Sequence, residues 1–381
     1  MVHRMFIDKT HRGFGLVEIL VGLAIGLLTT LVIMQVFSVF ERDKRATTGT
    51  ADAQVNGSVA LYSISRDLQQ AGFGMMPTDK KGTSPIECNP APTIDDGNLQ
   101  TPIITSNNRI PFDLAPVVVT DGGTAAGASD TISIRYGSSF AGGAPSVIKA
   151  VLGTTVSVDN NLGCRVCELA VVFNETGTAC TAGVVIGPHA TTKKCPDDQN
   201  DPPPFSDTVS IQFQDIAATE TATVVPGSSI ACLGRRSTQV YAVANGTLTL
   251  NGAPLVSGIV NLQAQYGIST TSGDNKITQW VNATAGTDNW AAPTVAMRNR
   301  IKAVRVAIVA RNSELEKDAV TSACSSTTDA NPTGLCSWAG SAASAAPAID
   351  LSNDPDWAKY RYRVFETIIP LRNVIWSYEA L

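Results

Sequence analysis

The sequence predicts an α+β protein in which a long N-terminal helix, hydrophobic at first and amphipathic afterwards, packs on a loop-rich, disulfide-stapled antiparallel β-sheet body. Three observations support this fold class. Twenty-two residues without a charge, Ile19 to Phe40, follow a short basic N-terminus. Several later segments alternate apolar and polar residues, which is typical of strands with one buried face. All eight cysteines lie at or beyond Cys88.

The amino-acid composition argues against some classes of function. The chain has 381 residues, enough to bury a substantial core, and only 16% of them are charged. Its 31 glycines and 20 prolines favour a loop-rich, strand-rich body over a helical enzyme. The formal net charge is −5 and no basic stripe is present, which argues against a nucleic-acid-binding protein.

The uncharged N-terminal segment is long enough for a membrane. A helix of its length spans about 33 Å, which matches a bilayer core of about 30 Å. A secretory signal peptide would be shorter and would precede a small-residue cleavage motif, whereas "SVFERDKRATT" follows here. A buried helix of a soluble domain would also be shorter, and a plain signal anchor gives no reason for Glu18.

The cysteines decide on which side of the membrane the body lies. Lysine and arginine flank both ends of the segment, so the positive-inside rule does not orient it. Disulfides form in oxidising compartments, and an even number of cysteines confined to the part beyond the apolar segment fits that setting. We therefore expect the body outside the cytoplasm.

Glu18 interrupts the apolar segment near its start. An ionisable group at the centre of a membrane helix costs about 2.5–3.5 kcal/mol, so it persists only with a partner or a task. The simpler alternative is a carboxylate that reaches back to water at the membrane surface.

Residues 13–18 resemble a type IV prepilin signal of class III. A short basic leader ends in Gly13, Phe14 follows, and Glu18 stands fifth after the glycine at the start of a long apolar helix. The resemblance implies that a membrane aspartic peptidase cleaves after Gly13 on the cytoplasmic side and N-methylates Phe14. It also implies that the mature helix leaves the membrane and packs into the core of a filament.

This resemblance gives Glu18 a partner. Cleavage creates a cationic amine on Phe14, four residues before Glu18 and on the same helix face. In a filament Glu18 can instead meet the Phe14 amine of a neighbouring subunit. A charge pair in an apolar assembly penalises any register that leaves one charge alone, so Glu18 would help to set the stagger between subunits.

Residues 51–72 predict an amphipathic continuation of the helix. Apolar residues recur there at spacings of three and four: Val55, Val59, Tyr62 and, one step round, Leu61, Ile64 and Leu68. We expect Gly72 and Gly74 to end the helix, and Gly49 and Gly57 to bend or loosen it.

A second resemblance covers both ends of the chain. The stretch "SRDLQQAGFG" at 65–74 is similar to the "RDLRQAGYFG" type of sequence that marks PilW-type minor pilins. "IKAVRVAIVAR" at 301–311 and "YRYRVFETIIPLRN" at 360–373 resemble the end of that family. The resemblance implies a pilin-like fold and a structural, non-enzymatic protein. Family members join other minor pilins in a tip complex that primes polymerisation of the major pilin and can carry a large tip adhesin.

The body is predicted to be β-rich. Alternating segments lie at 130–136, 207–213, 259–268, 304–310 and 360–369. We expect them to form an antiparallel sheet with its apolar face on the helix and its other face in water. Four parts follow: a cytoplasmic leader removed by cleavage at 1–13, a transmembrane or filament-core helix at 14–40, its amphipathic continuation at 41–72, and an extracytoplasmic body at 73–381.

The cysteines are disulfide candidates, although their spacing does not determine the pairing: Cys88, Cys164, Cys167, Cys180, Cys195, Cys232, Cys324 and Cys336. The pair Cys324–Cys336 is favoured, because the polar loop "SSTTDANPTGL" between them gains order from a link. A zinc site would need a second close pair beside Cys164 and Cys167, and a redox C-x-x-C would need a strand-to-helix context.

Other chemistry has little support in the sequence. Asp197, Asp198 and Asp201 could gather calcium, but they lack the glycine and the distal glutamate of a calcium loop, which favours a solvated turn. Two of the three histidines, His3 and His11, lie in the leader, and His189 is read as a loop residue. We expect no enzyme activity, no catalytic residues, no cofactor and no metal.

The resemblance also implies partners and a location. The partners are other minor pilins, the major pilin, the prepilin peptidase and methyltransferase, the inner-membrane assembly platform and a large tip adhesin, with no nucleic acid. The protein would sit in the inner membrane as a single span with a periplasmic body, and then in the pilus at the cell surface. Two alternatives stay open: a type II secretion minor pseudopilin, which uses the same signal, and an adhesion or binding module presented on the filament.

Overall fold

A computed structural model gives the fold of the chain. The structure describes residues 15–75, 93–95, 109–111, 114–139, 141–153, 155–160, 164–165, 168–174, 180–185, 210–214, 224–286 and 288–376. The chain divides into two compact units, residues 1–52 and residues 53–381. The α+β class with antiparallel sheets is confirmed, since every pairing between named strands in the described residues is antiparallel.

Helix α1 spans Leu16–Gln70, and its 55 residues include no proline. The two glycines expected to loosen it, Gly49 and Gly57, both lie inside the continuous helix. It ends where the sequence predicts, because Gly72 adopts the left-handed conformation, with φ at 76°. The amide of Gly72 donates to the carbonyl of Arg135 at 2.9 Å, which joins the end of the helix to the body.

Two open sheets form the part of the body next to the helix. The five-stranded sheet has the order β13-β12-β11-β4-β3, with strands Ala253–Ser257, Thr247–Leu250, Ser237–Ala244, Thr131–Tyr136 and Val117–Thr120. The four-stranded sheet has the order β15-β14-β16-β17, with strands Gln279–Val281, Ile259–Ile268, Ile301–Arg311 and Tyr362–Pro370. Helices α3 and α4 are short, at Val295–Arg298 and Arg372–Trp376, and a 3-10 turn, η3, spans Trp357–Lys359.

The remaining strands form a closed barrel and a small ribbon. The barrel has the order β10-β5-β6-β9-β8-β7, with strands Ser229–Gly234, Ser146–Leu152, Thr155–Val158, Ser210–Gln214, Cys180–Val185 and Leu169–Phe173. The ribbon pairs β1, Thr93–Asp95, with β2, Arg109–Pro111. The chain leaves the five-stranded sheet after β4 and returns in β11, and Tyr136 and Ser237 at these two points are paired. The barrel is thus an insertion between two neighbouring strands.

Two tight turns connect three neighbouring strands of the five-stranded sheet. Asn245 and Gly246 join β11 to β12, with φ at 50° and 70°, and Asn251 and Gly252 join β12 to β13, with φ at 52° and 79°. Two consecutive residues with positive φ are the pattern of a two-residue hairpin turn, for which Asn-Gly is the preferred sequence. Neither hairpin was predicted from the sequence, although each has the Asn-Gly pair that indicates such a turn.

The helix and both open sheets share one core. Within residues 53–381, the buried stripe of α1 consists mainly of small residues and two larger apolar ones, Ala53, Gly57, Ala60, Ile64 and Leu68, and Ala71 continues it just after the helix. The expected face was partly wrong. Ile64 and Leu68 are fully buried, but Val55, Val59 and Tyr62 are 60%, 48% and 68% exposed. A stripe of alanine and glycine lets the helix backbone approach the sheets more closely than valine or tyrosine would allow.

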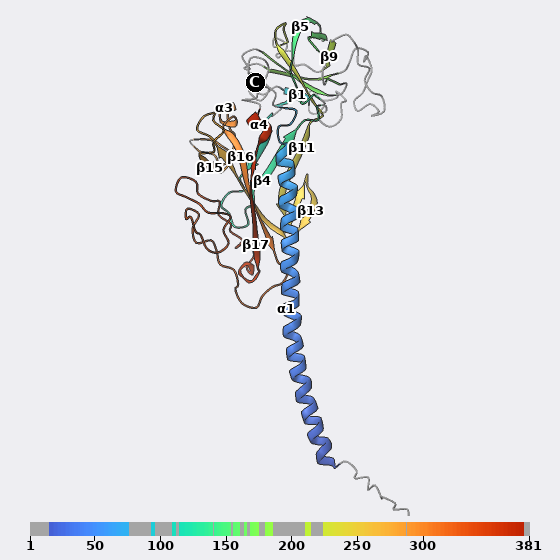
Figure 1. Ribbon diagram of the computed structural model, residues 1–381, viewed down its shortest axis with the longest axis vertical. Helices are drawn as coiled ribbons and strands as arrows, with labels where there is room; N and C mark the ends of the chain where they lie inside the picture. Colours follow the sequence, from blue (N-terminus) through green and yellow to red (C-terminus); the bar gives the residue numbers. More distant parts are fainter. Residues whose placement is uncertain are drawn as a thin grey trace, which may run out of the picture. The chain divides into compact units, whose positions relative to one another are not determined.

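Gly57 is the point of closest approach. A Cβ atom placed on Gly57 would lie only 2.1 Å from the Phe365 ring, on β17. Phe365 packs against the shared core and is paired across the sheet with Ile308. In Figure 1 the part of α1 in this unit runs alongside β11 and β17. Gly57 therefore serves helix–sheet packing and does not act as a bend.

The expectation of one wetted sheet face was wrong. The polar residues of β14 that should face water, Asn261, Gln263 and Gln265, are 0%, 4% and 1% exposed. The loop that holds Ala128 and the chain between β16 and β17 cover them, and Leu335, Ile349 and Leu351 of that chain pack beside Val309 on the outer side of β16. Burial is tolerated because the amides are hydrogen-bonded: those of Asn261 and Gln263 donate to the carbonyl of Ala128, and that of Gln265 to the carbonyl of Ala345.

We expect Gly57→Ala to destabilise the body. The added methyl collides with Phe365, and overpacking of this kind costs about 1–3 kcal/mol, which exceeds the gain of about 1 kcal/mol from helix propensity. All five tryptophans lie between residues 280 and 376, so thermal unfolding of the full chain in detergent can be followed by their fluorescence.

Gly26→Ala is the matched control, because a Cβ there meets nothing within 4 Å. Combining Gly57→Ala with Phe365→Leu should recover part of the loss. A more stable Gly57→Ala variant would show that the helix is not packed as closely as described.

Candidate functional site

The N-terminal part of α1 is the first candidate for a functional surface. Leu16 to Glu41 form a 26-residue segment that is almost wholly apolar, and none of its most apolar stretch is buried inside the protein. By length and composition it could cross a membrane, since about 20 apolar residues suffice. Because its side chains are exposed, it differs from a core helix of a soluble domain, which would be mostly buried.

Glu18 lies in the first turn of this segment. The amide of Glu18 donates to the carbonyl of Gly15 at 2.9 Å, so the residue is held in the helix from its start. A carboxylate in the first turn is favoured by the positive end of the helix dipole. Its side chain is exposed among apolar neighbours and makes no hydrogen bond or ion pair with any residue the structure describes. Gly13 and Phe14 lie outside the described residues, so their proposed roles remain predictions.

The other end of the segment is charged. Glu41 and Arg45, one helical turn apart, form an ion pair at 3.7 Å with both side chains well exposed. Such an exposed pair contributes little to stability, about 0.3–0.5 kcal/mol, so its position matters more than its strength. It marks where the apolar surface of α1 stops.

The "SRDLQQAG" stretch contributes a buried polar contact between helix and sheet. Asp67 is 3% exposed, and the hydroxyl of Tyr241 on β11 donates to its Oδ2 at 2.7 Å. Arg66 pairs with the other oxygen, Oδ1, at 3.0 Å. Burial, together with the Asp67 carboxylate, raises the pKa of Tyr241, so the hydroxyl stays protonated and keeps donating. Asp67 thus fixes the rotation of the helix on the sheet.

The cysteines that the structure describes are all oxidised. Cys324 is joined to Cys336, with the two Cα atoms 4.8 Å apart, and Cys164 is joined to Cys232, with 5.1 Å between Cα atoms. Cys180 is also disulfide-bonded. Since Cys164 bonds to a residue 68 positions away, the C-x-x-C is not a dithiol, and Cys164 is not free to bind zinc. Cys88, Cys167 and Cys195 lie outside the described residues.

Metal and catalytic candidates give no site in the described part of the chain. No group of three or more His, Cys, Asp or Glu side chains there could hold a metal ion. Asp197, Asp198, Asp201, His3, His11 and His189 lie outside the described residues.

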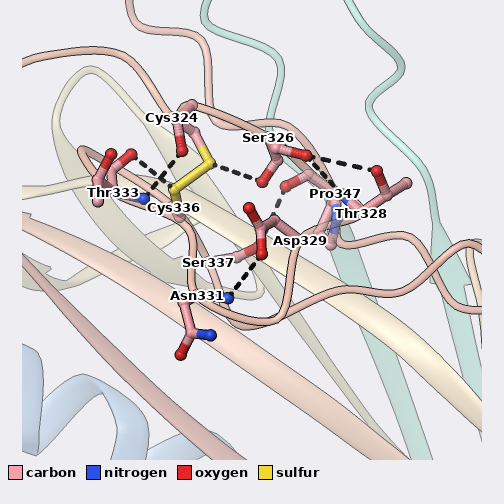
Figure 2. Close-up of a disulfide and its surroundings, with 10 residues drawn as sticks. Cys324, Ser326, Thr328, Asp329, Asn331, Thr333, Cys336, Ser337 and Pro347 are labelled. Atoms are coloured by element: carbon pink, nitrogen blue, oxygen red, sulfur yellow. Dashed lines mark hydrogen bonds between the residues drawn. A yellow bond between two sulfur atoms is a disulfide. The ribbon is translucent and has the colours of Figure 1, made fainter.

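The Cys324–Cys336 disulfide closes a polar loop over the four-stranded sheet (Figure 2). Inside the loop, Ser325 and Thr333 are joined by two hydrogen bonds, each 2.9 Å long. Beyond it, the hydroxyl of Ser337 donates to the carbonyl of Pro347 at 3.1 Å. The disulfide and these bonds fix the shape of the loop, but they do not attach it to the sheet.

Arg305 contributes to that attachment. Its guanidinium lies between two indole rings, with Cζ 4.7 Å from the centre of Trp280 and 4.2 Å from that of Trp338. Its Nε and Nη2 both donate to Oε1 of Gln265. Burial lowers the pKa of Arg305 to about 10, while Glu366 opposes that shift, so the group is charged at neutral pH. The stack connects β15, β16 and the segment that follows Cys336.

Sequence reasoning missed this cluster. The sequence predicted a strand at 304–310 with one face in water, and none of Arg305, Trp280 and Trp338 was singled out. A signal was present, because an arginine in the middle of an apolar strand needs charge or ring partners when the opposite face is also buried.

The comparison with protein families gives a match in the C-terminal part of the chain. Residues 225–373 match the family model described as type IV pilus-assembly protein W, PilW. The matched region runs from just before β10 to the beginning of α4, and includes the four-stranded sheet and the disulfide loop. Comparison with curated proteins and with solved structures finds no match. Helix α1 and most of the barrel lie outside the matched region.

We expect Arg305→Lys to lower the stability of the body by about 1–3 kcal/mol, because lysine loses the planar stack and the paired hydrogen bonds to Gln265. The fluorescence of the stacked tryptophans should change in the folded protein as well. Thermal unfolding of the full chain by tryptophan fluorescence measures both.

Arg363→Lys on the neighbouring strand is the control, since the Arg363 side chain is exposed. If the two variants lost equal stability, the guanidinium stack would have no special role.

Proposed function

Starting from the assignment to the PilW family that the match over residues 225–373 supports, we propose that this chain is a minor pilin that helps to initiate type IV pilus assembly. The role proposed is structural and not catalytic. The observation that carries the proposal is the family match. An unburied apolar segment, Leu16 to Glu41, that bears a carboxylate in its first turn supports it.

The proposed processing follows from the residues around the start of α1. Cleavage after Gly13 and methylation of Phe14 would leave a cationic amine four residues before Glu18. In the membrane this amine can neutralise Glu18 within one chain, and in a filament the same carboxylate can pair with the Phe14 amine of a neighbouring subunit. An unpaired charge in an apolar helix bundle is costly, so the pair favours one stagger between subunits.

The proposed place of action is the membrane first and the pilus afterwards. The apolar segment would anchor the chain in the inner membrane with the body in the periplasm, where disulfides persist. Extraction would then bring the helix into contact with other minor pilins and the major pilin. A body of more than 300 residues, with an inserted barrel, suits a tip or priming complex better than the shaft, where bulky subunits would crowd one another.

Mass spectrometry of the mature N-terminal peptide tests the proposal directly. We expect purified membranes and sheared filaments to yield a peptide that begins at methylated Phe14. An intact Met1 terminus, or a cut well beyond residue 40, would contradict the minor-pilin assignment. Recovery of the methylated peptide only with secretion-system proteins, and never with filaments, would favour a type II secretion pseudopilin.

We expect Glu18→Ala to be cleaved normally but to reduce incorporation into filaments by about tenfold or more. The reason is that removal of one partner of a buried charge pair costs about 3–5 kcal/mol. The measurement is the ratio of this chain to major pilin in sheared filaments, with the number of pili per cell counted alongside.

Glu41→Ala provides the control, because it removes a carboxylate from the other end of the same apolar segment, where the exposed pair with Arg45 contributes little. Unchanged incorporation of Glu18→Ala would rule out the charge pair as the determinant of assembly.

A further inference from the structure

A cavity of about 300 Å³ lies where the two open sheets meet. The turn between β11 and β12, the start of β14, the end of β16 and the start of β17 contribute to its walls, together with the loops that hold Gly127 and Asn353. Its volume is at the lower end of the range for small-molecule sites, about 300–1,000 Å³. The cavity is separate from helix α1 and from the disulfide loop discussed above.

The charged groups of the cavity neutralise each other. Nη1 of Arg311 lies 3.1 Å from Oδ2 of Asp354, and both side chains are about one-third exposed. The guanidinium of Arg311 also stacks on the ring of Tyr360, with Cζ 4.5 Å from its centre. The cavity therefore offers polar atoms without a net charge, which disfavours an anionic or a cationic ligand.

Two asparagine amides on the cavity wall are not used by the residues that the structure describes. Asn245 and Asn353 both line the cavity, and neither side chain makes a hydrogen bond to any residue that the structure describes. Each amide offers two donors and one oxygen that accepts. Val243, Val260 and Leu351 supply an apolar surface beside them, and Tyr362 supplies an aromatic ring.

The walls are fixed by contacts that do not involve a ligand. Asn245 belongs to the tight β11–β12 turn, with φ at 50°. The amide of Gly127 donates to the carbonyl of Asp350 at 2.7 Å, and Oδ1 of Asp354 accepts from the amide of Asp356 at 3.0 Å. The carboxylate of Asp130 holds the loop that contains Gly127 by accepting from the amides of Gly122 and Ala264, at 2.9 and 2.7 Å. A rigid wall reduces the entropy lost on binding.

We propose that this cavity binds a neutral saccharide, either a monosaccharide or one unit of a longer glycan. Sugar hydroxyls both donate and accept, so they match the Asn245 and Asn353 amides and the free lone pairs of Asp354. The C–H faces of a sugar ring pack on valine, leucine and tyrosine. A free amino acid or a peptide terminus fits less well, because its charges would have to displace the Arg311–Asp354 pair.

The test uses the full chain in a zwitterionic detergent, because alkyl glycoside detergents would compete for the cavity. The protein is first applied to an array of neutral glycans (hexose and N-acetylhexosamine oligosaccharides) and sialylated glycans. The neutral glycan with the strongest signal is then titrated by calorimetry. We expect saturable binding that Asn245→Gly and Asn353→Ala each weaken by about tenfold.

Asn251→Gly is the matched control. Glycine keeps the positive φ that each Asn-Gly turn requires, so Asn245→Gly and Asn251→Gly make the same backbone change in neighbouring turns. Of these two asparagines, Asn245 lines the cavity and Asn251 does not. We expect Asn251→Gly, despite losing its own hydrogen bonds to Val240 and Gln239, to bind within about twofold of the unaltered chain.

Three results would overturn the proposal. The first is the absence of neutral-glycan binding by the unaltered chain. The second is binding that Asn245→Gly and Asn353→Ala leave unchanged, which would place the site elsewhere. The third is preferential binding of sialylated glycans, or of free amino acids added as competitors, which would show that the chemical class is wrong. None of these results depends on whether the chain enters a filament.

Discussion

The packing of α1 against the two open sheets is the constraint on which the rest of residues 53–381 depends. A helix can approach a sheet this closely only if the residues in between are small, and Ala53, Gly57 and Ala60 meet that condition. Nearer the C-terminal end of the helix, Asp67 and Tyr241 add a buried hydrogen bond that fixes the rotation of the helix about its axis. Dispersion contacts set the distance between the helix and the sheets, and the Asp67–Tyr241 hydrogen bond sets the rotation of the helix.

The outer face of the four-stranded sheet follows a different principle. Its polar residues on β14 are buried, so each must find a hydrogen-bond partner. Gln265 finds one in the covering chain, and Asn261 and Gln263 find one in the carbonyl of Ala128. The covering chain in turn has few apolar residues of its own. The disulfide limits its freedom, and Arg305, held between Trp280 and Trp338, attaches it to the sheet. A polar sheet face can thus support a structured loop without a second large hydrophobic core.

Three regions carry different parts of the proposed function. The apolar part of α1 bears the features expected for membrane insertion and assembly, and its most apolar stretch is not buried inside the protein. The four-stranded sheet and its loop lie in the region that matches the PilW family model. The barrel is inserted between paired strands and lies mostly outside the match, so it adds bulk to the body without interrupting the sheet that holds the helix.

The sequence alone determined what depends on local pattern: the apolar span around Glu18, the end of the helix near Gly72, the strand at 259–268, the middle of the strand that contains 304–310, and the antiparallel α+β class. These follow from hydrophobic periodicity and from backbone preferences, which act over a few residues. Tertiary structure decided which helix face is buried. Val55 and Tyr62 could also have packed in a core, but beside Phe365 there is room only for a glycine, so the face that contains Gly57 is the one against the sheet. Tertiary structure also decided that Gln265 and Arg305 are buried, since the residues that cover them, Ala345 and Trp338, lie 80 and 33 positions further along the chain. The cavity beside Asn245 likewise exists only because distant loops converge.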